Sequence, residues 1–314
     1  MRAMVRRYEH DRDYERVGRF LLTTYGTGSG HVNWLQPRWE YMHYHPLVCE
    51  LDLTLIGVWE AGGLIVGVVH PEHTLGTAYV QIDPEWYELK EEMLTYAEEH
   101  LSASDNGVRR LRVYINDHDV EFQRVAAGMG YLKGRDCEPM SRLKLAEGLA
   151  VVSLPAGFRL MSLTESNDLR QVHRVLWRGF NHQGDPREDG IGGRVFMQSA
   201  PNFRKDLNIV VLAPNGAYVS YCGMWYEAVH RVAYVEPVAT DPEFRRIGLA
   251  RAAVLEGVRR CADRGATVAY VGSDRPFYRS LGFRQVYNRS AWEREWLRSP
   301  MTSRWGCRSI VEPT

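Results

Sequence analysis

The sequence predicts an α/β protein with a mixed sheet, built as two copies of one domain in tandem. The chain has 314 residues, which is long for one typical domain and suits two domains with separate cores. Each half shows the same order of segments: three apolar strand-like runs, a helix, a strand, a helix and a strand. The stretch from Tyr234 to Arg260 anchors this prediction, because a buried strand, a short basic loop and a proline-free helix follow one another there.

Composition and charge narrow the class of protein. Hydrophobic residues make up 45% and charged residues 25%, as in ordinary soluble globular domains. Lys and Arg together number 39, as do Asp and Glu, so the formal charge of zero argues against a nucleic-acid partner. No apolar run approaches a membrane span, and the N-terminus is too charged for a signal peptide. The five cysteines form no CxxC pair, which predicts reduced thiols in a cytoplasmic protein.

In the first half, residues 1–50 are expected to be helical and loop-like. Three apolar runs between Leu53 and Ile82 predict an antiparallel meander. A helix over 85–101, a strand over 108–116, and a helix and strand within 121–134 complete this half. We place the first domain at residues 1–148.

The second half, residues 149–298, predicts the same domain again. Its expected elements are a strand and helix start over 158–168, helices over 169–180 and near Val195, two strands within 208–227, the anchor strand 232–239, a helix from Gly248, a strand over 267–272, a helix over 276–281 and a strand over 283–292. Pro237 predicts a bulge or an irregular end in the anchor strand, since proline cannot donate a ladder hydrogen bond. The tail, residues 299–314, receives no assignment.

The loop Asp241–Ile247 carries the strongest functional signal. Arg245 and Arg246 stand at the N-terminal end of the following helix, where free N–H groups and the helix dipole favour an anion. Gly248 has no side chain, so a phosphate could approach the backbone closely. These features predict a pyrophosphate cradle, although a glycine at such a turn also has an ordinary structural explanation.

The cradle resembles a known motif. The run Arg245-Arg246-Ile247-Gly248-Leu249-Ala250 is similar to the [QR]-x-x-G-x-[GA] loop of the GNAT superfamily of N-acetyltransferases, and the segment 276–283, PFYRSLGF, matches a second mark of that family. The resemblance covers the C-terminal half. It implies acetyl-CoA as co-substrate and no metal. The residues that it implies for cofactor binding are Val238, Ala239 and Thr240 through their backbone, and Arg245, Arg246, Gly248, Leu249 and Ala250 at the pyrophosphate.

Two side chains are candidates for catalysis. By the resemblance, Tyr278 lies where family members carry a tyrosine near the CoA sulfur, and it would protonate the departing thiolate; the alternative is a core aromatic residue. Glu236 is the only carboxylate within the apolar anchor strand, and burial would raise its pKa toward that of a general base; the alternative is a structural acid paired with an arginine. The reaction would be direct attack of a primary amine on the thioester, with the N–H of Val238 polarising the carbonyl. A covalent route through Cys222 or Cys261 is disfavoured, because neither has a histidine neighbour in sequence.

The first half differs at the position of the cradle. It has no glycine there and seven acidic residues: Asp83, Glu85, Glu88, Glu91, Glu92, Glu98 and Glu99. Carboxylates would repel a pyrophosphate, so this half is predicted to be a non-binding copy that supports or shapes the active one. The pairs His43/His45 and His70/His73 lack a further ligand at the spacing of a known metal site.

The acceptor is the least defined part of the prediction. By the resemblance, segments 177–193 and 288–296 shape its site, and His182, Asp185, Glu188 and Asp189 could attract a cationic amine, although a solvated loop has the same composition. The predicted function is an acetyl-CoA-dependent N-acetyltransferase acting on a small-molecule or peptide amine. The alternatives are a non-catalytic acyl-CoA sensor and an interaction protein on the same fold. The sequence leaves a homodimer open.

Overall fold

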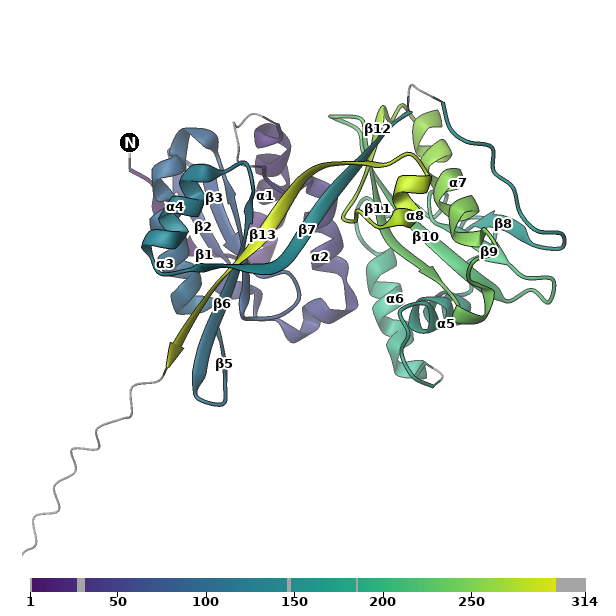
Figure 1. Cartoon of the computed structure of the whole chain (residues 1–314), viewed down its shortest axis with the longest axis horizontal. Coiled ribbons are helices and arrows are strands. Elements are labelled where there is room, and N and C mark those ends of the chain that lie inside the picture. The colour runs from purple at the N-terminus through teal and green to yellow at the C-terminus, as the bar shows by residue number, and fades with distance from the viewer. Residues whose placement is uncertain (1, 27–31, 146–147, 185, 298–314) are drawn as a thin grey trace, which may run out of the picture.

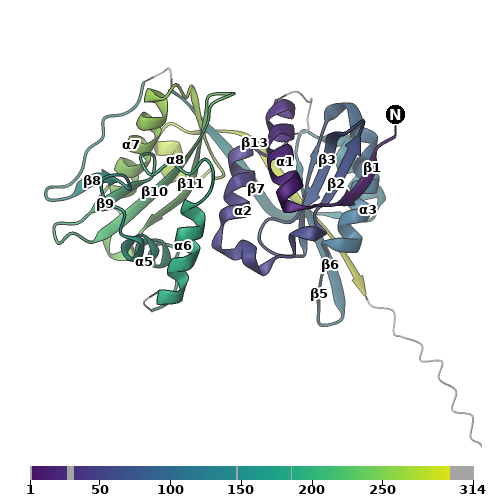
Figure 2. The same ribbon diagram turned by 180° about the vertical axis from the view of Figure 1, so that it is seen from behind.

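The chain folds into two α/β lobes that share strands of one continuous sheet (Figures 1 and 2). The computed structural model describes residues 2–26, 32–145, 148–184 and 186–297, so the tail 299–314 and Asp185 lie outside the described residues. Twelve strands follow one another in the order β1-β2-β3-β4-β6-β13-β7-β12-β11-β10-β9-β8, and β5 pairs with β6. The mixed α/β sheet predicted from the sequence is confirmed.

Elements from β1 to α4 form the N-terminal lobe. They are β1 (Met4–Arg7), α1 (His10–Thr24), α2 (Gln36–Tyr44), β2 (Gly57–Ala61), β3 (Leu64–His70), β4 (Thr77–Ile82), α3 (Lys90–His100), β5 (Ala103–Asp105), β6 (Val108–Asn116) and α4 (Val120–Gly128), with short 3-10 turns at 46–50, 53–55 and 84–89. Strands β2, β3 and β4 pair antiparallel in sequence order, as the predicted meander requires. Strand β4 then pairs with β6 in parallel.

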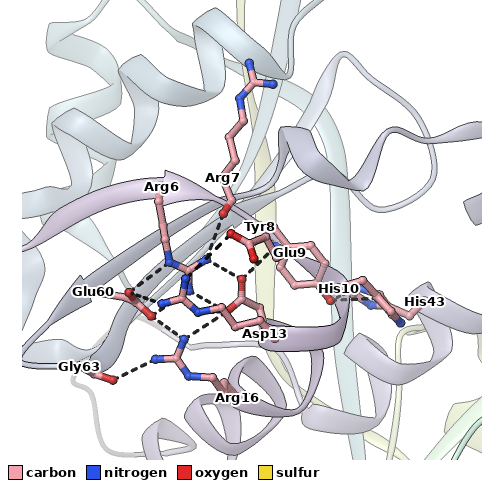
Figure 3. Close-up of polar contacts among 11 residues, drawn as sticks. Arg6, Arg7, Tyr8, Glu9, His10, Asp13, Arg16, His43, Glu60 and Gly63 are labelled. Carbon is pink, nitrogen blue, oxygen red and sulfur yellow. Dashed lines mark hydrogen bonds and ion pairs between the residues drawn. The ribbon is translucent and has the colours of Figure 1, made fainter.

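The expectation that residues 1–50 contain only helices and loops was wrong, because β1 is a strand at the edge of the sheet. A buried ion cluster holds it there (Figure 3). The guanidinium of Arg6 donates to Asp13 on α1 at 2.6 Å and to Glu60 on β2 at 2.8 Å. Asp13 is fully buried, so its charge needs these partners, and its pKa lies below the ordinary value although burial alone would raise it. Glu60 and the strand β2 that carries it lie 54 residues from Arg6, which explains why local patterns did not reveal the strand.

Elements from β8 to α8 form the C-terminal lobe. They are β8 (Arg159–Ser162), α5 (Leu169–Gly179), α6 (Ile191–Gln198), β9 (Ile209–Leu212), β10 (Tyr218–Glu227), β11 (Val232–Thr240), α7 (Leu249–Asp263), β12 (Val268–Val271) and α8 (Pro276–Ser280), with 3-10 turns at 188–190 and 242–244. Helix α7 packs against β9, β10 and β11. Its buried face includes Leu249, Ala253 and Val258, which lie in the core of this lobe.

Two long strands run between the lobes and exchange places (Figure 1). The last strand, β13 (Arg284–Leu297), pairs with β6 of the N-terminal lobe and with β7 (Leu132–Lys144) on its other side. The far end of β7 pairs with β12 of the C-terminal lobe. Leu143 of β7 therefore packs into the C-terminal core, and Trp292 of β13 into the N-terminal one.

Because each lobe contains a strand from the other half of the sequence, we expect the chain to unfold in one cooperative transition. The substitution Ala291→Pro tests this at a fully buried position of β13 that faces Tyr114 on β6. It should destabilise the whole chain by roughly 3 kcal/mol, because proline cannot donate in a central strand. Scanning calorimetry should show one transition shifted to lower temperature. Ala150→Pro, in the exposed connecting segment, is the matched control; two separate transitions would contradict shared folding.

Candidate active site

The site begins where β11 leaves its parallel neighbour β12. The two strands pair only from Val232 to Tyr234 on the β11 side. The antiparallel register between β10 and β11 shifts there, so that Glu236 and Pro237 stand together opposite Gly223. Such a bulge bends the strand. A Cβ at residue 223 would collide with the carbonyl oxygen of Glu236, which explains the glycine. The irregularity predicted from Pro237 is present.

Beyond the bulge, the backbone of β11 points alternately to β10 and into the gap. Asp241 donates its N–H to the carbonyl of Val219 on β10 at 3.0 Å. Since hydrogen-bonded pairs alternate along an antiparallel ladder, Ala239 also faces β10, whereas the backbone groups of Val238 and Thr240 face away from it. Val238 and Thr240 therefore meet the gap through their backbone, whereas the side chain of Ala239 is buried against α5.

A cavity of about 770 Å³ occupies this gap. All eight residues predicted to bind the cofactor line it, together with Tyr278. The wall also contains Gly179, Phe180, Asn181, Phe244, Arg251, Arg275, Phe277 and Ser280, none of which the sequence singled out for this role. Arg251 and Arg275 add positive charge from the first turn of α7 and from the N-cap of α8.

The N-terminal end of α7 opens onto the cavity. Gly248 is the N-cap with φ of 92°, a conformation that favours glycine, and no atom lies within 4 Å of where a Cβ would stand. Arg245 has a structural task, because its guanidinium donates to the carbonyl of Gly179 and the side chain of Asn181, both at 2.8 Å. It thereby joins the loop to the end of α5. Arg246 is exposed at the cavity wall with φ of 65°.

Tyr278 on α8 fits both interpretations of its role. Its ring lies 4.9 Å from that of Phe277 and 5.9 Å from that of Phe283, so it packs against the core. It also lines the cavity. Burial and the nearby Cys222 and Glu236 raise the pKa of its phenol above the ordinary value. The phenol therefore keeps its proton at neutral pH and is able to donate it.

Glu236 lines a second cavity of about 500 Å³, on the other side of the bulge. Burial, and then the charge of Glu72, raise the pKa of Glu236 to about 7, against the opposing effects of Arg38 and a hydrogen bond from Tyr234. Arg38 forms its ion pairs with Glu72 and Glu138. Among the ion pairs found in the described part of the chain, none involves Glu236. This favours the general base over the structural acid.

The second cavity lies between the lobes. From the segments expected to shape the acceptor site, it takes Phe180, His182 and Arg289. Glu188 and Asp189 do not line it; they form exposed pairs with Arg170 and Arg187. The other wall was not predicted, and it comes from Arg38, Tyr41, His45, Glu72, His73, Glu138, Pro139 and Met140 of the first half of the chain. Phe180 lines both cavities.

The corresponding gap of the N-terminal lobe is filled by the chain itself. Asp83-Pro84-Glu85 matches Asp241-Pro242-Glu243, and both aspartates cap a 3-10 turn, so Ile82 corresponds to Thr240. The carboxamide of Asn33 bonds both the N–H and the carbonyl of Ile82, at 2.8 and 2.9 Å. Lys90 at the start of α3 pairs with Asp119 at 2.6 Å, and both side chains are almost fully buried.

Cysteine and histidine take structural positions. Cys222 and Cys261 are buried in the C-terminal core, and burial raises the pKa of the Cys261 thiol to about 12. His43 is buried and bonds the carbonyl of Trp39 and the hydroxyl of Tyr8. Within the described residues, no three His, Cys, Asp or Glu side chains come together as a metal site requires. No helix in the same ranges is both long and apolar enough to span a membrane.

Comparison with known proteins agrees with this geometry. The model of the Acetyltransferase (GNAT) family matches residues 169–283. A mycothiol acetyltransferase from Saccharomonospora viridis is 26% identical over 238 residues, which cover 70% of each chain.

Two solved structures share the fold, each at 16% identity and a TM-score of 0.64. A GCN5-related N-acetyltransferase from Sphaerobacter thermophilus is covered to 95%, and 93% of this chain is matched. A tandem GNAT protein from the clavulanic acid biosynthesis pathway is covered to 98%, and 94% of this chain is matched. Residues 169–283 thus match the GNAT acetyltransferase family, and the chain as a whole shares its fold with a tandem GNAT protein.

Proposed function

We propose that this chain transfers an acetyl group from acetyl-CoA to a primary amine by direct attack in a ternary complex. The observation that carries the proposal is that Phe180 lines two cavities, one walled by the cradle and Tyr278 and the other by Glu236. In this proposal the segment 149–298 holds the cofactor and the catalytic groups. The segment 1–148 is a non-binding copy that closes the acceptor side.

The cofactor would lie along the gap between β11 and β12. The α7 N-terminus and Arg246 would face its pyrophosphate, where the helix dipole favours negative charge. The pantetheine arm would pair with backbone groups of Val238 and Thr240, because these face the gap. Arg245 would act by fixing the loop to the end of α5.

The reaction steps follow from two groups with raised pKa values, Glu236 and Tyr278. Glu236 takes a proton from the neutral attacking amine as the amine nitrogen forms a bond with the thioester carbonyl carbon. The N–H of Val238 stabilises the oxyanion. The C–S bond then breaks, and Tyr278 gives its proton to the departing thiolate. The products are the N-acetylated acceptor and CoA.

The decisive experiment is a calorimetric titration with acetyl-CoA, followed by an assay of CoA release on a panel of amines. We expect one acetyl-CoA per chain, because Asn33 and the Lys90–Asp119 pair fill the second gap. The acceptor of the related mycothiol acetyltransferase belongs on the panel. Binding without release on any amine would favour the acyl-CoA sensor, and two sites per chain would contradict the non-binding copy.

Gly248→Glu should lower the acetyl-CoA affinity at least about tenfold in the same titration, because a carboxylate would face the pyrophosphate across a desolvated wall. Gly216→Glu is the matched control, since Gly216 has φ of 82° and no atom within 4 Å of its Cβ position, yet it lies outside the cavity. Unchanged affinity in the Gly248 variant would refute the cradle.

Tyr278→Phe should lower kcat by about 10²- to 10⁴-fold with little change in acetyl-CoA affinity, because it removes only the proton donor. Tyr226→Phe provides the control, since its hydroxyl bonds the carbonyl of Arg264 away from both cavities. Equal turnover of wild type and the Tyr278 variant in a steady-state assay would leave Tyr278 as a core residue.

The rate should also follow the ionisation of Glu236. Its ionised form is the base, so kcat/KM should rise with pH through about 7 and fall below it. Glu236→Gln should remove this limb and lower the rate by about 10²- to 10⁴-fold at pH 7. Part of the rate should return at high pH, where the amine itself loses its proton. Glu188→Gln, an exposed carboxylate, should keep the wild-type profile; a Glu236 variant with that same profile would rule out the base.

A further inference from the structure

Glu236 faces a second group of carboxylates that belongs to the other half of the chain. Arg38 on α2 holds Glu72 through two hydrogen bonds of 2.8 Å and Glu138 on β7 through two, of 3.0 and 3.3 Å. Tyr79 donates its hydroxyl to Glu138. The guanidinium lies 4.0 Å from the ring of Trp34, which restrains it further. Arg38, Glu72, Glu138 and Glu236 all line the same cavity.

Glu72 brings a negative charge to this cavity. Burial would raise its pKa, but the charge of Arg38 and its hydrogen bonds lower the pKa to about 2, so Glu72 is ionised at neutral pH. Arg289 lines the cavity too and keeps its positive charge, while its guanidinium donates to the carbonyl of Val32 at 3.1 Å. A nearby negative charge opposes ionisation of another carboxylate.

Burial keeps several other titratable groups near Glu236 neutral at the pH of interest. It leaves protons on the phenols of Tyr41, Tyr234 and Tyr278 and on the thiol of Cys222, since it raises the pKa of each. Burial also lowers the pKa of His45 to about 3 and that of His73 below its ordinary value. His182 and Arg289 line the cavity as well. Glu72 therefore supplies a fixed negative charge on the cavity that Glu236 lines.

We propose that Glu72 and Glu138, held by Arg38, are positioning residues through which the N-terminal lobe sets the proton affinity of the base Glu236. The role of Glu236 as the base rests on the proposed function. The effect of Glu72 and Glu138 on its ionisation does not. With one charge of the cluster removed, Glu236 should lose its proton more readily. The non-binding lobe would thus tune the base of the binding lobe.

The test measures the ionisation of the Glu236 carboxyl group directly. The full chain is labelled with ¹³C at the glutamate carboxyl carbons, and the signal of Glu236 is the one that disappears in Glu236→Gln. Its titration is followed by NMR in wild type, Glu72→Gln and the control Glu91→Gln, which removes an exposed charge on α3. We expect the midpoint to move down by about one pH unit in Glu72→Gln and to stay in place in the control.

Glu138→Gln should move the midpoint in the same direction, and it keeps the test valid if Glu72→Gln fails to fold. A midpoint that stays at the wild-type value in the folded variants overturns the inference, whatever the activity does. The pH dependence of kcat/KM is then compared with the NMR midpoint. If the NMR midpoint moves but the pH dependence of kcat/KM does not, the electrostatic inference is supported and Glu236 is not the base. Failure of the inference and failure of the proposed function are therefore distinguishable.

Discussion

The site depends on the divergence of β11 from β12 after Tyr234. Two parallel strands that paired to their ends would leave no gap. The backbone groups of Val238 would then hydrogen-bond to the neighbouring strand. The bulge at Glu236 and Pro237 turns the strand away and needs the missing side chain of Gly223 to do so. One irregularity therefore places Val238 on the cavity of about 770 Å³ and Glu236 on the cavity of about 500 Å³.

The exchange of β7 and β13 brings residues of both lobes to the cavity that Glu236 lines. Glu138 comes to it on β7, and Arg289 on β13. Strand β7 pairs with β12 of the C-terminal lobe, β13 pairs with β6 of the N-terminal lobe, and the two strands pair with each other, so backbone hydrogen bonds hold this part of the wall in place. Such rigidity would suit the proposed reaction, in which an amine and a thioester must lie within reacting distance.

The sequence predicted those elements whose signal lies within a few neighbouring residues. The apolar meander, the cradle loop and the helix after it are patterns within a few residues, and the structure confirms these elements. The strand over 283–292 was also predicted, but its partners β6 and β7 were not, since pairing depends on contacts far along the chain. The Arg38–Glu138 pair spans 100 residues, and β1 depends on Glu60, 54 residues from Arg6. No local signal marks such contacts, so the wall of the acceptor cavity could not be predicted.

The same gap is closed by the chain in one lobe and open as a cavity in the other. In the N-terminal lobe, the gap-facing N–H and carbonyl of Ile82 are both satisfied by the carboxamide of Asn33. A buried backbone group without a partner costs free energy, so a closed copy has to supply one from its own chain. In the C-terminal lobe the same gap stays open as a cavity of about 770 Å³, with basic side chains at one end. A ligand with both amide groups and negative charge would hydrogen-bond to the gap-facing backbone and pair with the basic side chains. A CoA thioester has both features.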